Sequence, residues 1–248
     1  MSFKHFCIAA LTLVAIAMLP VSCTQKGGQK RSAAIMASYE TAQKAQDYQT
    51  ACAFLVQLAA EDSAANKWAY DSLAFYHYFY LFTPGTVRNT HTGKYYAQKG
   101  LDLNPANDFL QEIKAKLELE EQKVGSAEAT FQNLWRKTND YTYWWILSFI
   151  EAHANGNLKK ADSMITMAIT EPAAKGKTVR MEHIQERIRE TVSAKAAFLY
   201  LKATLLMVNK DLTGSAQLLN EALKESPDFY AAKRSIYDMT QGGPARPQ

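Results

Sequence analysis

The chain has 248 residues, of which 48% are hydrophobic and 21% are charged, and its formal net charge at pH 7 is +4. This balance excludes a disordered chain and is sufficient for one sizeable core or one array of repeats. Basic and acidic residues are interspersed, and apart from Arg187 and Arg189, each close to a glutamate, basic residues rarely cluster. Because nucleic-acid binding needs a concentrated basic patch, we expect no nucleic-acid partner.

The N-terminus has the pattern of an export signal. Lys4 precedes an apolar run from Phe6 to Met18, and small residues around Cys23 follow it. The run is short for a membrane-spanning helix and matches the apolar core of a secretory signal. We therefore expect residues 1–23 to be a signal peptide and residues 24–31, TQKGGQKR, to be a flexible tether.

The end of this signal resembles that of bacterial lipoproteins, in which the cysteine after the apolar run is lipidated and becomes the first residue of the mature chain. Val21 and Ser22 fit that signal, whereas Pro20 stands where the family prefers leucine or another apolar residue. The resemblance implies lipidation of Cys23 and a lipid anchor in the cell envelope, at the outer membrane and facing the periplasm. The alternatives are ordinary signal cleavage near the same position and an uncleaved anchor helix.

Cysteine use agrees with this division of the chain. Cys7 lies inside the signal and Cys23 at its end, so only Cys52 remains in the folded part. No intrachain disulfide is expected. Cys52 lies in a helical stretch with no histidine nearby in sequence, and we expect it to be a buried small hydrophobic residue.

The remainder of the chain has the pattern of an all-α protein. The interior prolines after the signal, at Pro84, Pro105, Pro172 and Pro227, each stand where a helix is expected to stop. We find no sustained alternation of apolar and polar residues, so the sequence predicts helices almost throughout.

Small and apolar residues recur in these helices with a period of 34 residues. A window that begins at Thr142 has them at positions 4, 8, 20, 24 and 27, and a window from Asp108, 34 residues earlier, has them at most of these positions. A third window begins at Ala196 and has Pro227 at position 32. The residues are Trp145, Phe149, Ala161, Ile165 and Ala168 in the first window, Ala115, Ala127, Phe131 and Leu134 in the second, and Leu199, Ala203, Ser215, Leu219 and Ala222 in the third.

These positions resemble the tetratricopeptide repeat, which has a large apolar residue early in its first helix, small residues where its two helices cross, and a terminal proline. Small side chains are needed at the crossing because the two helices approach closely there. The stretch NGNLKKA fits the turn of this family, with Gly156 free to take a left-handed conformation and Asn157 able to cap the next helix.

The resemblance implies an all-α, right-handed superhelical solenoid of helix-turn-helix repeats, with about five units and a closing helix, over residues 32–239. The expected units lie near residues 32–65, 66–107, 108–141, 142–175 and 196–229, with the closing helix after Pro227 and a disordered tail at residues 240–248.

Two insertions interrupt the period. The stretch TPGTVRNTH in the second unit predicts an enlarged loop between its helices. Residues 176–195 separate the fourth and fifth units, and there Met181, Ile184, Ile188 and Val192 mark one face at helical spacing. This spacing predicts an inserted helix.

Catalytic and metal-binding patterns do not hold. The stretch RNTHTGKY ends like a phosphate-binding loop, but Arg88 replaces its first glycine and Tyr95 replaces the serine or threonine after its lysine. His183 has Glu182 and Glu186 nearby, a combination more typical of solvated charges than of metal ligands. We expect neither an enzyme nor a bound metal or cofactor.

In stacked repeats the first helix of each pair lines the concave side, so its exposed positions form a groove. The predicted groove is aromatic and apolar with few charges. Its residues are Lys67, Tyr70, His77, Tyr78, Glu112, Lys116, Tyr143, Ile146, Ile150, His153, Tyr200, Thr204 and Met207. The neighbouring Trp144 and Trp145, and the aromatic helix of residues 74–82, are expected mainly in the core.

The sequence therefore predicts an exported, membrane-anchored scaffold that binds another envelope protein or peptide. Repeat domains that clamp a C-terminal carboxylate use cationic and amide groove residues, which this chain lacks at most of those positions, so apolar or extended partners are favoured. One alternative is a repeat lipoprotein of an outer-membrane assembly machinery, which is similar in plan. Another is a lipoprotein that captures a glycan or peptide, with Tyr143, Trp144 and the aromatic helix as platforms.

Overall fold

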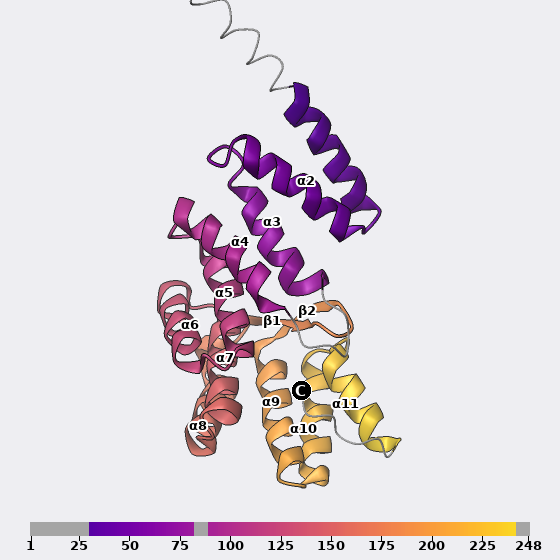
Figure 1. The fold of residues 1–248 in the computed structure, drawn as a ribbon. Coiled ribbons are helices and arrows are strands. Elements are labelled where there is room, and N and C mark those ends of the chain that lie inside the picture. The colour runs from indigo at the N-terminus through magenta and orange to yellow at the C-terminus, as the bar shows by residue number, and fades with distance from the viewer. Residues whose placement is uncertain (1–29, 82–88, 242–248) are drawn as a thin grey trace, which may run out of the picture.

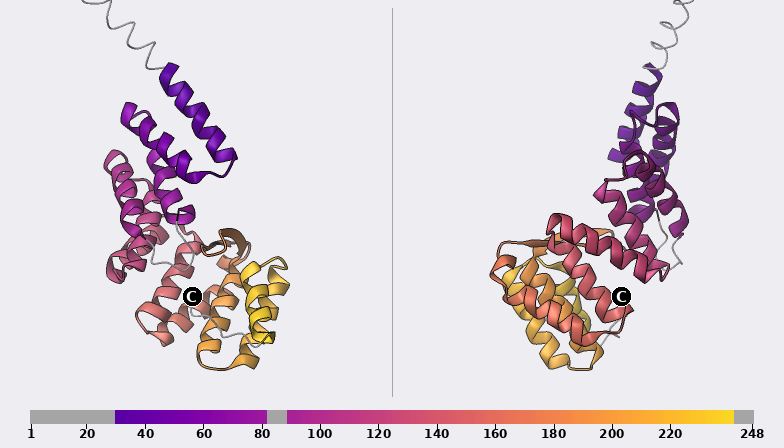
Figure 2. Two further views of the ribbon diagram at one scale, coloured as in Figure 1. Left: turned by 45° about the vertical axis from the view of Figure 1, so that its right-hand side comes forward. Right: turned by 90° about the vertical axis from the view of Figure 1, so that its left-hand side faces the viewer.

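The structure is a computed structural model that describes residues 30–81 and 89–241. The predicted signal of residues 1–23 and residues 24–29 of the predicted tether lie outside the described residues. So do residues 82–88, which include the first six residues of the predicted loop, and residues 242–248 of the predicted tail. Successive helices stack side by side along a curved array, with the first unit and the last helix at opposite ends (Figures 1 and 2). The prediction of an all-α solenoid of helix pairs is confirmed.

Each of the five predicted units contains one pair of helices, which we call helix A and helix B. The first pair is the helix of residues 30–44 and α2 (Tyr48–Glu61), and the second is α3 (Trp68–Phe75), continued by η1 (Tyr76–Tyr80), and α4 (Thr90–Leu103). The third is α5 (Asp108–Glu120) and α6 (Val124–Thr138), and the fourth is α7 (Tyr141–Phe149), continued by η2 (Ile150–Ala154), and α8 (Leu158–Thr170). The fifth is α9 (Ala194–Val208) and α10 (Leu212–Glu225), and α11 (Tyr230–Thr240) closes the array.

Short polar side chains set where most of these helices begin. Asn107, for example, accepts a hydrogen bond from the Leu110 amide and so satisfies a free amide at the start of α5. The predicted turn of the fourth unit is confirmed, because Gly156 has φ of +66° and the Asn157 side chain accepts from the Lys160 amide. The other capping side chains are Asp47, Asn89, Asp140, Ser193 and Asp211.

Small residues lie where the helices cross. Ala127, Ala161 and Ser215 are fully buried, as the repeat pattern predicts. In α4 the same role belongs to Gly93 and Gly100, since a Cβ atom on Gly100 would lie 3.1 Å from the Tyr70 Cβ and against the Leu110 side chain. These close approaches bring α3 and α5 together across α4.

The prediction of an inserted helix at residues 176–195 is wrong. The segment is an antiparallel β-hairpin of β1 (Thr178–His183) and β2 (Ile188–Ser193), in which Val179 pairs with Val192 and Glu182 with Arg189. The hairpin is closed at its base by a hydrogen bond of 2.8 Å from the Ala194 amide to the Lys177 carbonyl. In Figure 1 it lies between the end of α3 and the start of α9.

Other boundaries also differ from the prediction. Residues 30 and 31, the last two of the predicted tether, are helical, and so is Thr240, the first residue of the predicted tail. In the second unit α4 begins at Thr90, which places the last two residues of the predicted loop inside a helix. Within residues 30–81 and 89–241, no helix is both long and apolar enough to cross a membrane.

Candidate functional site

The candidate site is the surface formed by the helices A of units two to four, which are α3 with η1, α5 and α7. We call it the helix A face. It has two parts, because the β-hairpin covers the portion formed by η1, α5 and α7, whereas the portion next to the first unit is open. The predicted groove residues divide between these parts and the core.

In the second unit the predicted groove residues divide between the helix A face and the contact with α4. Tyr70 and His77 point toward α4, where Tyr70 lies against Gly100 and His77 stacks on Tyr96 with 5.5 Å between ring centroids. They therefore pack between the two helices of their unit, and Lys67, exposed, precedes the first turn of α3. Tyr78 lies on the helix A face, together with Asp71 and Phe75, which were not predicted.

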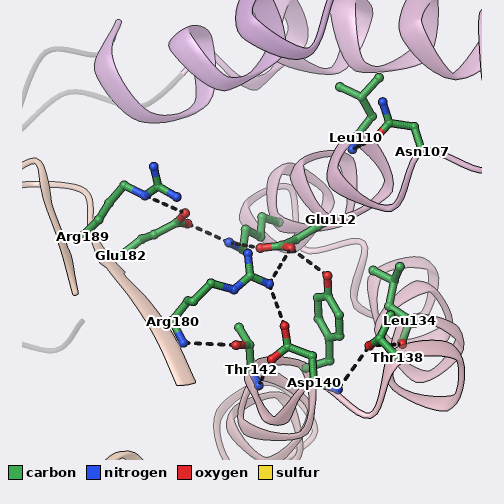
Figure 3. A network of polar contacts seen from close by, with 12 residues as sticks. Asn107, Leu110, Glu112, Leu134, Thr138, Asp140, Thr142, Arg180, Glu182 and Arg189 are labelled. Atoms are coloured by element: carbon green, nitrogen blue, oxygen red, sulfur yellow. Dashed lines mark hydrogen bonds and ion pairs between the residues drawn. The ribbon is translucent and has the colours of Figure 1, made fainter. Parts of the chain in front are cut away.

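Glu112, Tyr143 and Arg180 form the centre of a buried polar network. The Tyr143 hydroxyl donates to Glu112 Oε2 at 2.9 Å, and the Arg180 guanidinium lies 3.3 Å from the same oxygen and 3.0 Å from Asp140 Oδ2. The Arg180 amide also donates to the Thr142 hydroxyl at 3.1 Å. Figure 3 shows Arg180 projecting from the hairpin toward Glu112 and Asp140. The hairpin is thereby fixed to α5 and α7.

A second set of contacts continues the network toward η1. Lys116 Nζ lies 2.7 Å from Glu112 Oε1 and 2.7 Å from Glu182 Oε2, and the Tyr78 hydroxyl donates to that Glu182 oxygen at 2.8 Å. Arg189 on the paired strand approaches the other Glu182 oxygen at 3.8 Å (Figure 3). Two predicted groove residues, Tyr78 and Lys116, therefore converge on one acidic side chain of the hairpin, and Lys116 links it to a third, Glu112.

The network holds its charges in ionised form. Burial acts to raise the pKa of Glu112, but Lys116 and Arg180 outweigh it and lower that pKa. Burial likewise acts to lower the pKa of Lys116, and Glu112 and Glu182 outweigh it and raise that pKa. Burial and the Glu112 carboxylate both raise the pKa of the Tyr143 hydroxyl, which remains a hydrogen-bond donor at neutral pH.

The opposite face of the hairpin contacts the end of the array. Glu190 accepts hydrogen bonds from the Tyr230 and Ala231 amides at 2.8 and 3.3 Å, so it caps α11, whose own N-cap residue Phe229 provides no side-chain acceptor. His183 Nε2 lies 2.5 Å from the same carboxylate. The expectation that His183 and Glu182 are solvated is thus wrong. Glu182 joins the hairpin to η1 and α5, and the His183 ring lies against Tyr230 of α11, with 5.4 Å between ring centroids.

Other predicted groove residues lie in the core. Ile146 and Ile150 are 8% and 0% exposed and pack with Phe131 between the third and fourth units. Tyr200 is 2% exposed and lies against Phe229, with 5.2 Å between ring centroids. These three side chains offer no surface to a partner, because α7 and α9 are themselves covered by neighbouring helices and by the hairpin.

The predicted groove residues nearest the C-terminus lie on two different elements. Thr204 and Met207 are half-buried on α9, and His153 is exposed beside Phe149, with 4.4 Å between ring centroids. Trp144 and Trp145, earlier in α7, are partly buried. The Trp144 indole N–H donates to the Met164 carbonyl, and the Trp145 indole N–H donates to the Ala197 carbonyl.

The open part of the helix A face is an aromatic cavity of about 310 Å³ between the first three units. Its walls include stacked Tyr48 and Tyr80 rings 3.8 Å apart and the Phe75 ring 5.9 Å from that of Phe109. Phe109 lies at its rim and is 38% exposed. The lining residues are Gln43, Tyr48, Asp71, Ser72, Phe75, Tyr76, Tyr80 and Phe109.

The predicted groove did not include these lining residues. Three of them, Phe75, Tyr76 and Tyr80, belong to the aromatic helix of residues 74–82, which the ligand-capture alternative named as a platform. Among the described residues, no group of three histidine, cysteine or acidic side chains is arranged to hold a metal ion.

No protein-family model and no curated protein matches this chain. Among solved structures, a MamA double mutant (MamA RS-1 ArsTM) is similar with a TM-score of 0.54 and 10% sequence identity, over 83% of this chain and 96% of that one. A tetratricopeptide repeat protein from Parabacteroides merdae is similar with a TM-score of 0.53 and 12% identity, over 88% and 80% of the two chains. At such identities the likeness concerns the fold, and the chain has the fold of a tetratricopeptide-repeat protein.

Proposed function

We propose that this chain is an exported, membrane-anchored scaffold that binds an extended segment of a partner protein at the cell envelope. The observation that carries the binding part is the division of the helix A face. The hairpin fills its middle with buried contacts, and an aromatic cavity of about 310 Å³ stays open beside it. Aromatic side chains supply large contact areas at a low entropic cost, which makes the open cavity the favoured binding surface.

The shape of the cavity favours a protein segment over a small ligand. Small-molecule sites enclose most of the ligand surface, whereas this cavity opens at its rim, where Phe109 is exposed. The cavity also draws on three successive units, so a segment that crosses it can continue along the array. The proposal assigns the chain no catalytic role.

The envelope location rests on the N-terminal sequence. Cys23 ends a stretch that resembles a lipoprotein signal, and the sequence predicts a short flexible tether after it. A flexible tether of about six residues would have a root-mean-square span of about 13 Å. A lipid at Cys23 would therefore hold the array next to the membrane surface.

Site-specific crosslinking tests the binding part. We would place a photoreactive phenylalanine analogue at Phe109, at the rim, and in a second variant at Tyr237, which is 60% exposed on α11. The proposal expects one discrete protein adduct from position 109 in envelope fractions and none from position 237. The adduct should be lost in Phe75→Ala, and the partner, once identified and purified, should bind the wild-type chain directly. Adducts that form equally from both positions, or none from position 109, would contradict it.

A further inference from the structure

We propose that the open cavity receives a cationic side chain, arginine or lysine, from the bound segment, with Asp71 as its counter-ion. This inference rests on the proposed function and names what the partner presents. Of the eight lining residues, Asp71 is the one with an ionisable carboxylate, and none is a lysine or an arginine. The Ser72 hydroxyl and the Gln43 amide add hydrogen-bond acceptors, so the polar part of the lining suits a donor-rich group.

Asp71 has lost solvent, and within residues 30–81 and 89–241 no lysine or arginine forms an ion pair with its carboxylate. The carboxylate accepts a hydrogen bond from Asn107 Nδ2 to Oδ1 at 2.9 Å. Burial raises the pKa of Asp71, against the smaller opposing effects of Asn107 and Lys67. A carboxylate in this state gains more from an arriving cation than a fully hydrated one, because much of its desolvation has already occurred.

The aromatic walls favour the same class of ligand. Phe75 and Tyr80 meet edge to face, with 5.7 Å between centroids and 89° between planes, and Tyr48 stacks on Tyr80. Cations bind over the faces of such rings, and arginine does so most often. A guanidinium in the cavity can therefore pair with Asp71 at one end and contact ring faces along its length.

The chain itself shows a guanidinium on one of these rings. The Arg189 guanidinium carbon, from the hairpin, lies 5.0 Å from the Phe75 ring centroid. The positive charge of Arg189 is partly offset by the nearby Glu182 carboxylate. Arg187 and Arg189 are both exposed, so solvent and salt screen their repulsion of an incoming cation. The Asp71 attraction acts inside the cavity, where screening is weaker.

Nuclear magnetic resonance titration tests the proposal with defined probes. N-acetylarginine methylamide would be added to the isotope-labelled chain, and N-acetylcitrulline methylamide, which has nearly the same shape without the charge, would be the matched probe. We expect saturable shifts of the Tyr48, Ser72 and Phe109 amide signals with arginine, and binding at least about tenfold weaker with citrulline. Asp71→Asn should abolish this preference, whereas Asp102→Asn, an exposed change on α4, should leave it intact.

Three outcomes would overturn the inference. Equal binding of the two probes, or no shifts with either, would show that the cavity does not select a cation. An arginine preference that survives in Asp71→Asn would remove Asp71 as the counter-ion. The crosslinking from position 109 does not depend on the class of side chain bound, so it can succeed when this inference fails, and it can fail independently.

Discussion

At the residue scale, the feature with the largest energetic consequence is the charged network between the hairpin and the helix A face. Glu112 is 5% exposed, and it is compensated by Lys116, Arg180 and the Tyr143 hydroxyl. A buried charge is costly by itself and is tolerated only with partners of good geometry. The network is therefore sensitive to the loss of any one of its central members.

Glu112→Gln is the most direct test of the network. The change keeps the shape of the side chain and removes the charge, so the largely buried charge of Lys116 and the partly exposed charge of Arg180 remain with less compensation. Because Glu182 and Asp140 remain, we expect the free energy of unfolding to fall by about 2–4 kcal/mol. Chemical denaturation at neutral pH measures it. Asp162→Asn, which breaks a solvent-exposed pair with Lys202, is the matched control and should cost no more than about 0.5 kcal/mol.

The same variant has a predicted pH dependence. The Glu112 pKa is lower in the folded than in the unfolded chain, so its stabilising contribution is complete above the ordinary glutamate pKa and is lost as pH falls through the folded value. The Lys116 pKa is raised, so its contribution is lost only as pH rises through its folded value in strong alkali. The stability difference between wild type and Glu112→Gln should therefore shrink on acidification. A difference independent of acid pH would contradict the electrostatic explanation.

Cys52 should behave as an inert thiol. Its side chain is buried at the first unit, as the sequence predicts, and burial raises its pKa to about 12. Because the thiolate is the reactive form, we expect a chain that begins at residue 24 to react with a thiol reagent at mildly alkaline pH only after unfolding in guanidinium. Rapid reaction of the native chain would contradict the burial of Cys52.

The repeat register placed some predicted residues on the helix A face and others in the core. In the third unit Glu112 and Lys116 lie on the helix A face. In the second unit the aromatic residues surround the helix on every side and give no unique apolar stripe, so Tyr78 was placed on this face whereas Asp71 and Phe75 were missed. The hairpin partners of Glu112 could not be predicted from spacing, because they come from an insertion outside the repeat.

At the element scale, helix crossing points depend on glycine in the second unit. Gly100 lies against Tyr70 and Leu110, whereas a Cβ atom added to Gly125, in the first turn of α6, would meet no atom within 4 Å. Both glycines are helical, so alanine improves helix propensity at each site. Only Gly100 has to accommodate the added methyl group in a filled space.

Gly100→Ala and Gly125→Ala therefore form a matched pair. We expect Gly100→Ala to lower the free energy of unfolding by about 1–2 kcal/mol, because overpacking outweighs the gain in propensity. Gly125→Ala should raise it by about 0.5 kcal/mol. Thermal unfolding of the two variants measures the difference. Equal effects would show that α3, α4 and α5 do not meet as closely as described.

The hairpin shows why element type was harder to predict than element position. Ile188 and Val192 are four residues apart, which is about one helical turn and also two strand periods, so both lie on one face in either structure. The residues that distinguish the two are β-branched, including Thr178, Val179 and Thr191, and they favour strands. In β1 Val179 and Met181 are buried, whereas Thr178 and Arg180 are exposed. This alternation of buried and exposed residues is too short to outweigh the helical spacing of the apolar residues in the sequence.

At the scale of the whole molecule, the hairpin connects parts of the array that are distant in sequence. One face contacts η1, α5 and α7 through Arg180 and Glu182, and the other caps α11 through Glu190. Repeat arrays otherwise hold together through neighbouring units alone. The hairpin therefore acts as a brace that fixes the curvature of the array.

Excision of the hairpin tests this role. Lys177 and Ala194 are hydrogen bonded to each other, so a short glycine linker can join them without displacing α9. We expect the helical content to remain, the melting temperature to fall, and the radius of gyration in solution scattering to increase as units two to four separate from the last helices. Arg187→Gly, at a turn position with φ of 56°, is the control and should change neither quantity by much. An unchanged radius of gyration after excision would show that the units hold their curvature without it.

The general architecture was predictable because recurrence at a fixed period is a property of the whole chain and survives errors at single positions.

The proposed location of the array at the membrane rests on a separate signal, the cysteine that ends the apolar N-terminal run, and Cys23→Ser tests it. If Cys23 carries the lipid, the variant should leave the membrane pellet and appear in the soluble envelope fraction, because serine cannot take the thioether-linked lipid. The mature wild-type chain should also show the added mass of acyl chains at its first residue. Retention of Cys23→Ser in the membrane, with residues 1–22 still present in its mass, would instead identify the apolar run as an uncleaved anchor. The array would then stand at the same short distance from the membrane through a protein segment, and the binding proposal for the open cavity would be unchanged.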